Sequence, residues 1–175
     1  MAGEPDASGR SDGLAELYRR HAPSGFRLAF LLTGSRVAAE DLLHDAFVRV
    51  AGRFRHLQFP QAFDTYLRST IVNLHISQLR KQRSERMYVD RQRGRGPDVD
   101  VLPDVAVRHE LWEALMALPP RQRAGVVLRF YEDLSERQAA EIMGSSLEAL
   151  RSAVARGMRT LRSAIGGEIG DRPRS

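Results

Sequence analysis

The sequence predicts an all-α protein made of two small helical domains joined by a flexible linker, with a helix-turn-helix in the C-terminal domain. Three observations predict this architecture. Apolar residues recur at steps of three and four in several segments on both sides of residues 87–106. Residues 87–106 themselves combine glycines and prolines with aspartates, which is typical of a linker. No segment shows the alternation of a half-buried strand, and no internal repeat is present.

Composition limits the classes of function. Hydrophobic residues make up 42% of the 175 residues, enough for packed cores. The formal net charge of +5 favours an anionic partner such as nucleic acid. The chain has no cysteine, which excludes disulfides and cysteine-bound zinc, and no motif calls for a cofactor. Residues 1–13 lack the apolar core of a signal peptide, and the longest aliphatic and aromatic run, residues 28–32, is too short to span a bilayer. We therefore expect a disordered N-terminus over residues 1–13 and a cytoplasmic protein.

The first domain is expected over residues 14–86 and begins with two helices. The first starts at Leu14, and Pro23 and Gly25 should kink or split it. A turn follows at residues 33–36. The second helix has a predicted buried face of Ala39, Leu43, Ala46, Phe47 and Val50. Its outer face holds the polar residues Asp41, His44, Asp45 and Arg49.

A third helix completes this domain. Residues 52–59 are expected to form a loop, and Pro60 suits the first turn of the helix after it. The predicted inner stripe of this helix is Phe63, Leu67, Ile71 and Leu74. Its C-terminal end is basic, with Arg80, Lys81, Arg83 and Arg86.

The second domain is expected over residues 107–165, followed by a tail at residues 166–175. Its first helix bears Leu111, Trp112, Leu115 and Met116, and it ends at the LPP sequence of residues 118–120. The next helix starts at Pro120, with Ala124, Val127, Leu128 and Tyr131 predicted to face inward. Ser135 and Gln138 form a capping box, which should open a short helix that ends at Gly144.

The stretch GSSLEALRSAVARG, residues 144–157, predicts the second half of a helix-turn-helix. Gly144 fits the left-handed position that closes the preceding helix, and Ser145 with Glu148 suggests a capping box for the next one. One face of that helix is apolar, with Leu147, Leu150, Val154, Met158 and Leu161. The other faces offer basic and polar groups to a DNA groove, including Arg151, Ser152, Arg156 and Arg159. An ordinary antiparallel helix pair with solvated arginines is the alternative interpretation.

Three segments of the sequence resemble a known protein family. The segment LPPRQRAGVVLRFYEDLSERQAAEIMGSSLEALRSAVARGMRTLR, residues 118–162, closely resembles the C-terminal DNA-binding region of bacterial RNA polymerase sigma factors of the extracytoplasmic-function (ECF) subfamily. LYRRHAPSGFRLAFLLTGSRVAAEDLLHDAFVRV, residues 17–50, looks like the core-binding helices of that subfamily, and YLRSTIVNLHISQLRKQR, residues 66–83, looks like its promoter-melting helix. The segment FYEDLSE is similar to the corresponding sequence in a branch of this subfamily that is common in actinobacteria.

The resemblance implies a non-catalytic protein that binds core RNA polymerase and promoter DNA. The outer face with Asp41, His44 and Asp45, and Leu42 beside it, would clamp onto a coiled coil of the largest (beta-prime) subunit. The first helices of the second domain would dock on a flap of the beta subunit, with the linker threading between them towards the RNA path. The family usually has glutamine where this chain has His44, so core binding could depend on pH. Many family members have an anti-sigma protein, which makes one a candidate partner.

The resemblance also assigns two sets of DNA-binding residues. The set expected to recognise and melt the minus-10 element is Phe54, His56, Phe59, Tyr66, Asn73, Arg80 and Lys81. Aromatic side chains beside positive charge are suited to hold an opened strand, although Phe63 is better explained as a core residue. The set expected to read the minus-35 element is Glu148, Ala149, Arg151, Ser152, Arg156 and Arg159. Within it, we expect Arg151 to contact bases and Arg156 and Arg159 to hold phosphates, while Ala149 and Ala153 give the exposed face little to read with.

Two other classes of function remain as alternatives. A helix-turn-helix regulator that binds DNA alone would explain the second domain but leaves the acidic face of the first without a role. A metalloenzyme would use the spacing of Asp41 and His44, which is that of carboxylate-histidine ligand pairs in helical bundles. A dinuclear site needs a second such pair, and the sequence contains none. Co-purification with core polymerase distinguishes a sigma factor from the regulator, and bound metal in the purified protein would favour the metalloenzyme.

Overall fold

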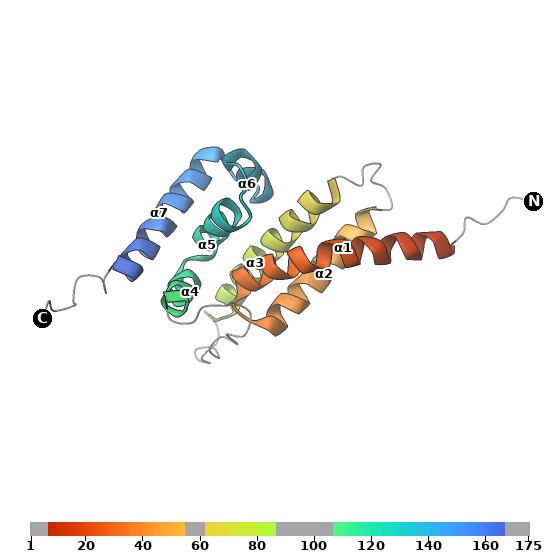
Figure 1. Ribbon diagram of the computed structural model, residues 1–175, viewed down its shortest axis with the longest axis horizontal. Helices are drawn as coiled ribbons and strands as arrows, with labels where there is room; N and C mark the ends of the chain where they lie inside the picture. The colour runs from red at the N-terminus through yellow and green to blue at the C-terminus, as the bar shows by residue number, and fades with distance from the viewer. Residues whose placement is uncertain (1–6, 55–61, 87–106, 167–175) are drawn as a thin grey trace, which may run out of the picture.

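The computed structural model describes residues 7–54, 62–86 and 107–166, which form two blocks of helices that lie side by side (Figure 1). The described residues contain no strand, so the all-α prediction is confirmed. The first block consists of α1 (Ala7–Thr33), α2 (Arg36–Phe54) and α3 (Phe63–Arg86). The second consists of α4 (Val107–Ala117), α5 (Pro120–Val126), the π-helix η2 (Val127–Tyr131), α6 (Glu136–Ile142) and α7 (Leu147–Gly166). None of the helices in these ranges is long and apolar enough to cross a membrane.

Helix α1 is longer than expected, and Pro23 does not split it. It begins at Ala7, so residues 7–13, predicted to be disordered, are helical. Pro23 lies on the exposed side of the helix, where water can hydrate a carbonyl that loses its helical partner. Gly25 is buried, and a Cβ there would lie 2.8 Å from Leu43 Cδ1. This glycine therefore allows α1 to pack closely on α2 instead of breaking α1.

The second and third helices follow their predicted patterns closely. Gly34, with φ of +73°, makes the turn after α1. The predicted inner stripes of both helices are buried: Ala39, Leu43, Ala46, Phe47 and Val50 on α2, and Phe63, Leu67, Ile71 and Leu74 on α3. Helix α2 continues to Phe54, so residues 52–54 of the expected loop are helical. The rest of that loop, with His56 and Phe59, lies outside the described residues, as does Pro60, which was expected in the first turn of the third helix.

A π-turn in the second block overturns one expectation. Helix α5 begins with Pro120 and continues into η2, where the Glu132 N–H donates to the Val127 carbonyl five residues earlier at 3.0 Å. This wider turn changes the angular step between residues. Tyr131, predicted to face inward with Val127 and Leu128, is consequently 47% exposed.

The helix-turn-helix is present, with its second cap shifted by one residue. The capping box of Ser135 and Gln138 is formed in both directions, and Gly144 has φ of +55°, as predicted. The predicted box of Ser145 and Glu148 is wrong, because α7 begins at Leu147 and Ser146 Oγ accepts from the Ala149 N–H at 3.1 Å.

The Schellman turn after α6 explains the shift. The Ser145 N–H donates back to the Ala140 carbonyl, and the Gly144 N–H donates to the Glu141 carbonyl, both at 3.0 Å. Ser145 therefore completes the end of α6, and the next serine caps α7.

The two blocks share one hydrophobic core, which the sequence did not indicate. The rings of Phe30 on α1 and Trp112 on α4 stack with centroids 5.1 Å apart. Arg123 on α5 donates to the Leu32 carbonyl at the end of α1 at 2.6 Å. The expected linker, residues 87–106, lies outside the described residues, but the two blocks that it joins pack on each other, with α3 against α5 and α6. Helix α7 lies on the side of the second block away from the first (Figure 1).

Candidate nucleic-acid and polymerase interfaces

The outer face of α2 carries the polar residues that the sequence placed there. Asp41, His44 and Asp45 are exposed, opposite the buried Leu43 and Phe47. No group of three or more His, Asp or Glu side chains in the described parts of the chain is placed to hold a metal ion.

Leu42 was expected to lie beside this polar face and to contact the polymerase, but the structure places it in the core. Its side chain is only 1% exposed, so it belongs to the core. Three residues after Ala39 and four before Ala46, Leu42 shares their face of the helix. The polar face therefore consists of Asp41, His44 and Asp45 without an apolar member.

A groove of about 480 Å³ runs between α2 and α3 and includes two of the expected minus-10 residues. Tyr66 is 44% exposed, and Asn73 is exposed with its Nδ2 donating to Ser69 Oγ at 3.2 Å. The groove is lined by Arg49, Val50, Tyr66, Ser69, Thr70, Asn73, Leu74 and Ser77. Sequence reasoning put Arg49 on the outer face of α2 but did not connect it with this groove.

Two of the other expected minus-10 residues, Arg80 and Lys81, do not line the groove. Arg80 and Lys81 are exposed further along α3, about 20 Å from Tyr66 at the rise of an α-helix. Phe63 is fully buried, as expected of a core residue. Phe54 lies at the end of α2, but its side chain, like residues 56 and 59, falls outside the described set.

Helix α7 is amphipathic, as predicted. Leu150 and Leu161 are buried, and Leu147, Val154 and Met158 are partly buried on the same face. Gly157 lets this face approach α5, since a Cβ there would lie 2.9 Å from Val126 Cγ2. The residues of the expected minus-35 set are all exposed: Glu148, Ala149, Arg151, Ser152, Arg156 and Arg159.

The position of Ala153 on this helix differs from the prediction. It was expected on the exposed face with Ala149, but its side chain is only 6% exposed. Three residues after Leu150 and four before Gly157, it lies on the face that packs on the second block. The short side chain is thus explained by packing.

Sequence reasoning missed a partner of Arg151. The Nε–H of Arg151 donates to Glu136 Oε2 at 2.7 Å, and the two residues are 15 apart in the chain. Glu136 is the first residue of α6, across the turn from α7. Only the packing of α6 on α7 brings them together, so no local pattern could have indicated the contact.

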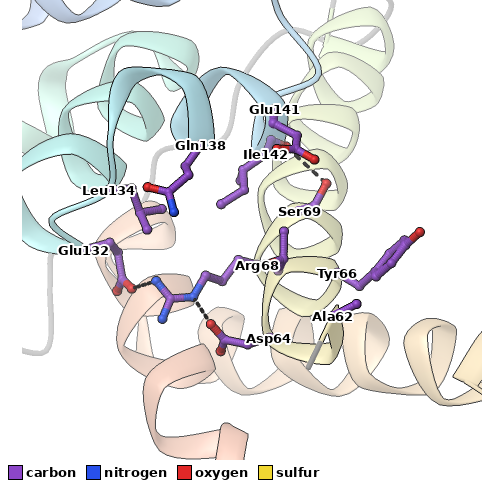
Figure 2. Close-up of a pocket in the computed structure, with 11 residues that line it drawn as sticks. Ala62, Asp64, Tyr66, Arg68, Ser69, Glu132, Leu134, Gln138, Glu141 and Ile142 are labelled. Carbon is purple, nitrogen blue, oxygen red and sulfur yellow. Dashed lines mark hydrogen bonds and ion pairs between the residues drawn. The ribbon is translucent and has the colours of Figure 1, made fainter. Parts of the chain in front are cut away.

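Ionisable side chains line the interface between the blocks. Arg68 on α3 forms ion pairs with Asp64, at 2.8 Å between Nε and Oδ2, and with Glu132 of the second block (Figure 2). Ser69 Oγ donates to the Ile142 carbonyl of α6 at 3.1 Å. These contacts border a pocket of about 630 Å³ between α3 and α6, with Tyr66 at its rim. One edge of the candidate minus-10 surface is thereby joined to the helix-turn-helix.

Burial shifts the pKa values of two groups at this interface. Burial raises the pKa of Glu132 above its ordinary value, although the positive charge of Arg68 lowers it. Burial and the neighbouring Arg123 lower the pKa of His75 to about 4. At neutral pH the His75 ring is therefore uncharged.

Comparisons with known proteins match both blocks. Residues 17–85 match the model of sigma-70 region 2, and residues 108–161 match that of sigma-70 region 4. The ECF RNA polymerase sigma factor SigE of Mycolicibacterium smegmatis is 34% identical over 153 residues, which cover 84% of this chain and 59% of that protein. The RNA polymerase sigma-E factor of Streptomyces coelicolor is 30% identical over 150 residues, 86% of this chain and 84% of that protein.

Solved structures support the fold. The sigma factor RpoE in complex with the anti-sigma factor NepR from Bartonella quintana aligns with a TM-score of 0.70 at 21% identity, covering 91% of this chain and 99% of that one. CnrH in complex with the cytosolic domain of CnrY aligns with a TM-score of 0.64 at 19% identity, covering 92% of both chains. With both regions matched in order, the chain belongs to the sigma-70 family of RNA polymerase sigma factors, in its extracytoplasmic-function group.

Proposed function

We propose that this chain binds core RNA polymerase through the outer face of α2 and selects promoters through α3 and α7. Asp41, His44 and Asp45 contact the largest subunit, the groove with Tyr66 and Asn73 holds the opened minus-10 strand, and α7 enters the major groove of the minus-35 element. The chain itself is non-catalytic and acts in the cytoplasm, where the polymerase carries out the chemistry. The similarity to sigma factors solved with anti-sigma proteins also supports a partner of that class.

The amphipathic α7 is the observation that carries the proposal most strongly. Its apolar face is closed against α4, α5 and α6, which leaves Arg151, Arg156 and Arg159 on surfaces open to solvent. A helix fixed in this way at the end of a helix-turn-helix offers its N-terminal residues to base edges and its later arginines to phosphates. Without an exposed face that carries arginines, the second block would be better explained as an ordinary helical bundle.

The groove between α2 and α3 supports the minus-10 assignment. A volume of about 480 Å³ accommodates an unstacked base, and its lining offers the Tyr66 ring, the Asn73 amide and the Arg49 guanidinium. Stacking on an aromatic ring beside a positive charge is how single strands are commonly held. The aromatic Tyr66 is exposed although it lies in a helix with a large buried face, which is in keeping with a binding role.

Holoenzyme assembly tests the polymerase interface. Replacing Asp41 and Asp45 together with alanine removes exposed carboxylates without opening a cavity, so the helical content should stay unchanged. Binding to purified core polymerase should weaken at least tenfold if charged contacts there resemble those of other interfaces. A double variant with Glu141→Ala and Glu148→Ala removes the same charge from exposed sites on α6 and α7, outside the helices expected to contact the polymerase, and is the matched control. Equal core binding by the wild type and the Asp41/Asp45 variant would show that this face is merely solvated.

A further inference from the structure

Arg151 is held by a carboxylate in a way that Arg156 and Arg159 are not. Its Nε–H donates to Glu136 Oε2 at 2.7 Å. Within the described part of the chain, no other side chain bonds the Arg151 guanidinium, and neither Arg156 nor Arg159 has an ion-pair partner. The two terminal amino groups of Arg151 therefore have no side-chain partner in these residues, and the side chain is 61% exposed.

The support for Glu136 is rigid. The capping box of Ser135 and Gln138 fixes the first turn of α6, where Glu136 lies. Ser146 caps α7 five residues before Arg151, and Ala139 and Leu150 are fully buried between the two helices. The backbone positions of Glu136 and Arg151 are thus fixed relative to each other by the core of the helix-turn-helix.

Stability does not explain this pair. The side chains of Arg151 and Glu136 are 61% and 40% exposed, and ion pairs in such positions contribute little to folding. A carboxylate on a DNA-facing surface also repels phosphates, so Glu136 acts against general affinity for DNA. Its benefit must therefore lie in what it does to Arg151.

The geometry favours one kind of base. With Nε occupied, the guanidinium presents its two terminal N–H groups as parallel donors, and its orientation is already restricted before DNA binds. Two parallel donors match O6 and N7 of guanine in the major groove, whereas adenine offers one acceptor and one donor there.

We propose that Glu136 is a positioning residue that orients Arg151 towards a guanine of the minus-35 element and so sharpens promoter choice. This inference rests on the proposed function of α7. The inference predicts two separate effects of Glu136. This residue increases discrimination between bases at one base pair, and it lowers the affinity of the protein for DNA of any sequence. A carboxylate with a purely structural role would alter neither the identity of the preferred base nor the strength of the preference.

A randomised minus-35 library tests this inference with reconstituted holoenzyme. Arg151→Ala should reduce the preference for G·C at one base pair by roughly tenfold or more, the loss expected for a bidentate contact. Glu136→Gln should reduce the preference at the same base pair by a smaller factor, about three- to fivefold, because the uncharged amide oxygen of glutamine accepts from Arg151 Nε more weakly than the carboxylate does and orients it less. Binding to scrambled duplex should be unchanged or stronger for Glu136→Gln. The double variant should have the same profile as Arg151→Ala.

The controls separate the possible failures. Glu141→Gln removes one exposed carboxylate from the same helix as Glu136 and should leave the profile unchanged, and circular dichroism checks that each variant is folded. If Arg151→Ala flattens the preference but Glu136→Gln does not, the positioning role is overturned and base reading by Arg151 stands. If Arg151→Ala leaves the preference intact, both are overturned, although promoter-directed initiation by the wild type still supports a sigma factor. A wild type that directs no initiation from any library member overturns the proposed function itself.

Discussion

Two adjoining faces of α3 are buried in different ways. Towards α1 and α2, the helix buries Phe63, Leu67 and Ile71 among aliphatic and aromatic side chains. Towards the second block, it buries His75 and partly buries Arg68 and Ser69. The interior of the first block is thus apolar, whereas the interface between the blocks combines an aromatic stack with ionisable groups.

The interface between the blocks leaves some polar atoms without partners. Within the described residues, His75 Nε2, Trp112 Nε1 and Arg123 Nε are buried and have no hydrogen-bond partner. A buried polar atom of this kind offsets part of the stabilisation that the apolar contacts give. The Arg123 guanidinium donates to the carbonyls of Leu32, Met116 and Leu118 but has no carboxylate partner among the described residues. We infer that the association of the blocks contributes less to stability than the packing inside each block does.

The largest expected effect comes from removing a ring inside the first block. Phe63→Ala should lower the free energy of unfolding by about 3–5 kcal/mol, because Phe63 is fully buried and its removal leaves a cavity. Urea denaturation followed by circular dichroism measures this loss. Phe30→Ala is the matched variant, since Phe30 is 4% exposed and stacks on Trp112 across the interface. Its effect should be smaller, because separation of the blocks lets water reach the site. Equal losses for the two variants would contradict the difference between interior and interface.

A loss of stability in acid should arise from the interface. The pKa of His75 falls from an ordinary 6.5 to about 4 in the folded protein, so the folded state favours the neutral ring. Its contribution is fully present above pH 6.5 and is lost as the pH falls towards 4, by on the order of 3 kcal/mol. The raised pKa of Glu132 acts in the opposite direction, because its contribution is lost as the pH rises through the folded-state value.

Variants of two histidines isolate the effect of His75. His75→Leu should remove most of the acid-induced loss, whereas His109→Leu, at an exposed site on α4, should not. Small-angle scattering between pH 7 and pH 4 should show the blocks separating while circular dichroism still reports helices. An unchanged acid transition in His75→Leu would exclude this group as its cause.

The successes and failures of sequence reasoning have physical causes. Residues such as Leu67, Leu150 and Asp45 were placed correctly because helical spacing alone decides which face they occupy. Leu42 was misplaced because a wide apolar stripe includes adjacent positions, and Tyr131 because a π-turn changes the angular step between residues. The roles of the exposed residues in binding polymerase and DNA stay predictions.

Contacts between distant residues escaped prediction altogether. Glu136 and Arg151 are 15 residues apart, and Arg68 and Glu132 are 64 apart. Neither spacing corresponds to a helical or turn periodicity, so both contacts depend on how whole helices pack. The association of the two blocks escaped for the same reason, since the glycines and prolines of residues 87–106 predict a linker whether or not the blocks that it joins pack on each other.

A smaller effect is expected for the ion pair of Arg68 and Glu132 across the interface. Burial raises the pKa of Glu132 despite the charge of Arg68, so the cost of removing the carboxylate from water offsets much of the attraction. A double-mutant cycle with Arg68→Met and Glu132→Gln should therefore give a coupling of only about 1 kcal/mol. Arg68→Met should be the more harmful single change, because it leaves both Asp64 and Glu132 without their shared cation.

The exposed pair of Arg36 and Glu40 on α2 provides the comparison for this cycle. Their side chains are 65% and 55% exposed, and the coupling should be about 0.3–0.5 kcal/mol, as for other exposed pairs at this spacing. Raising the salt concentration should abolish the Arg36–Glu40 coupling while most of the Arg68–Glu132 coupling persists, since salt screens buried pairs much less. The Arg68 and Glu132 side chains are only 20% and 9% exposed, so salt should screen the attraction between them much less. If both couplings disappear together in salt, water reaches Arg68 and Glu132 in solution, and the blocks are then apart for much of the time.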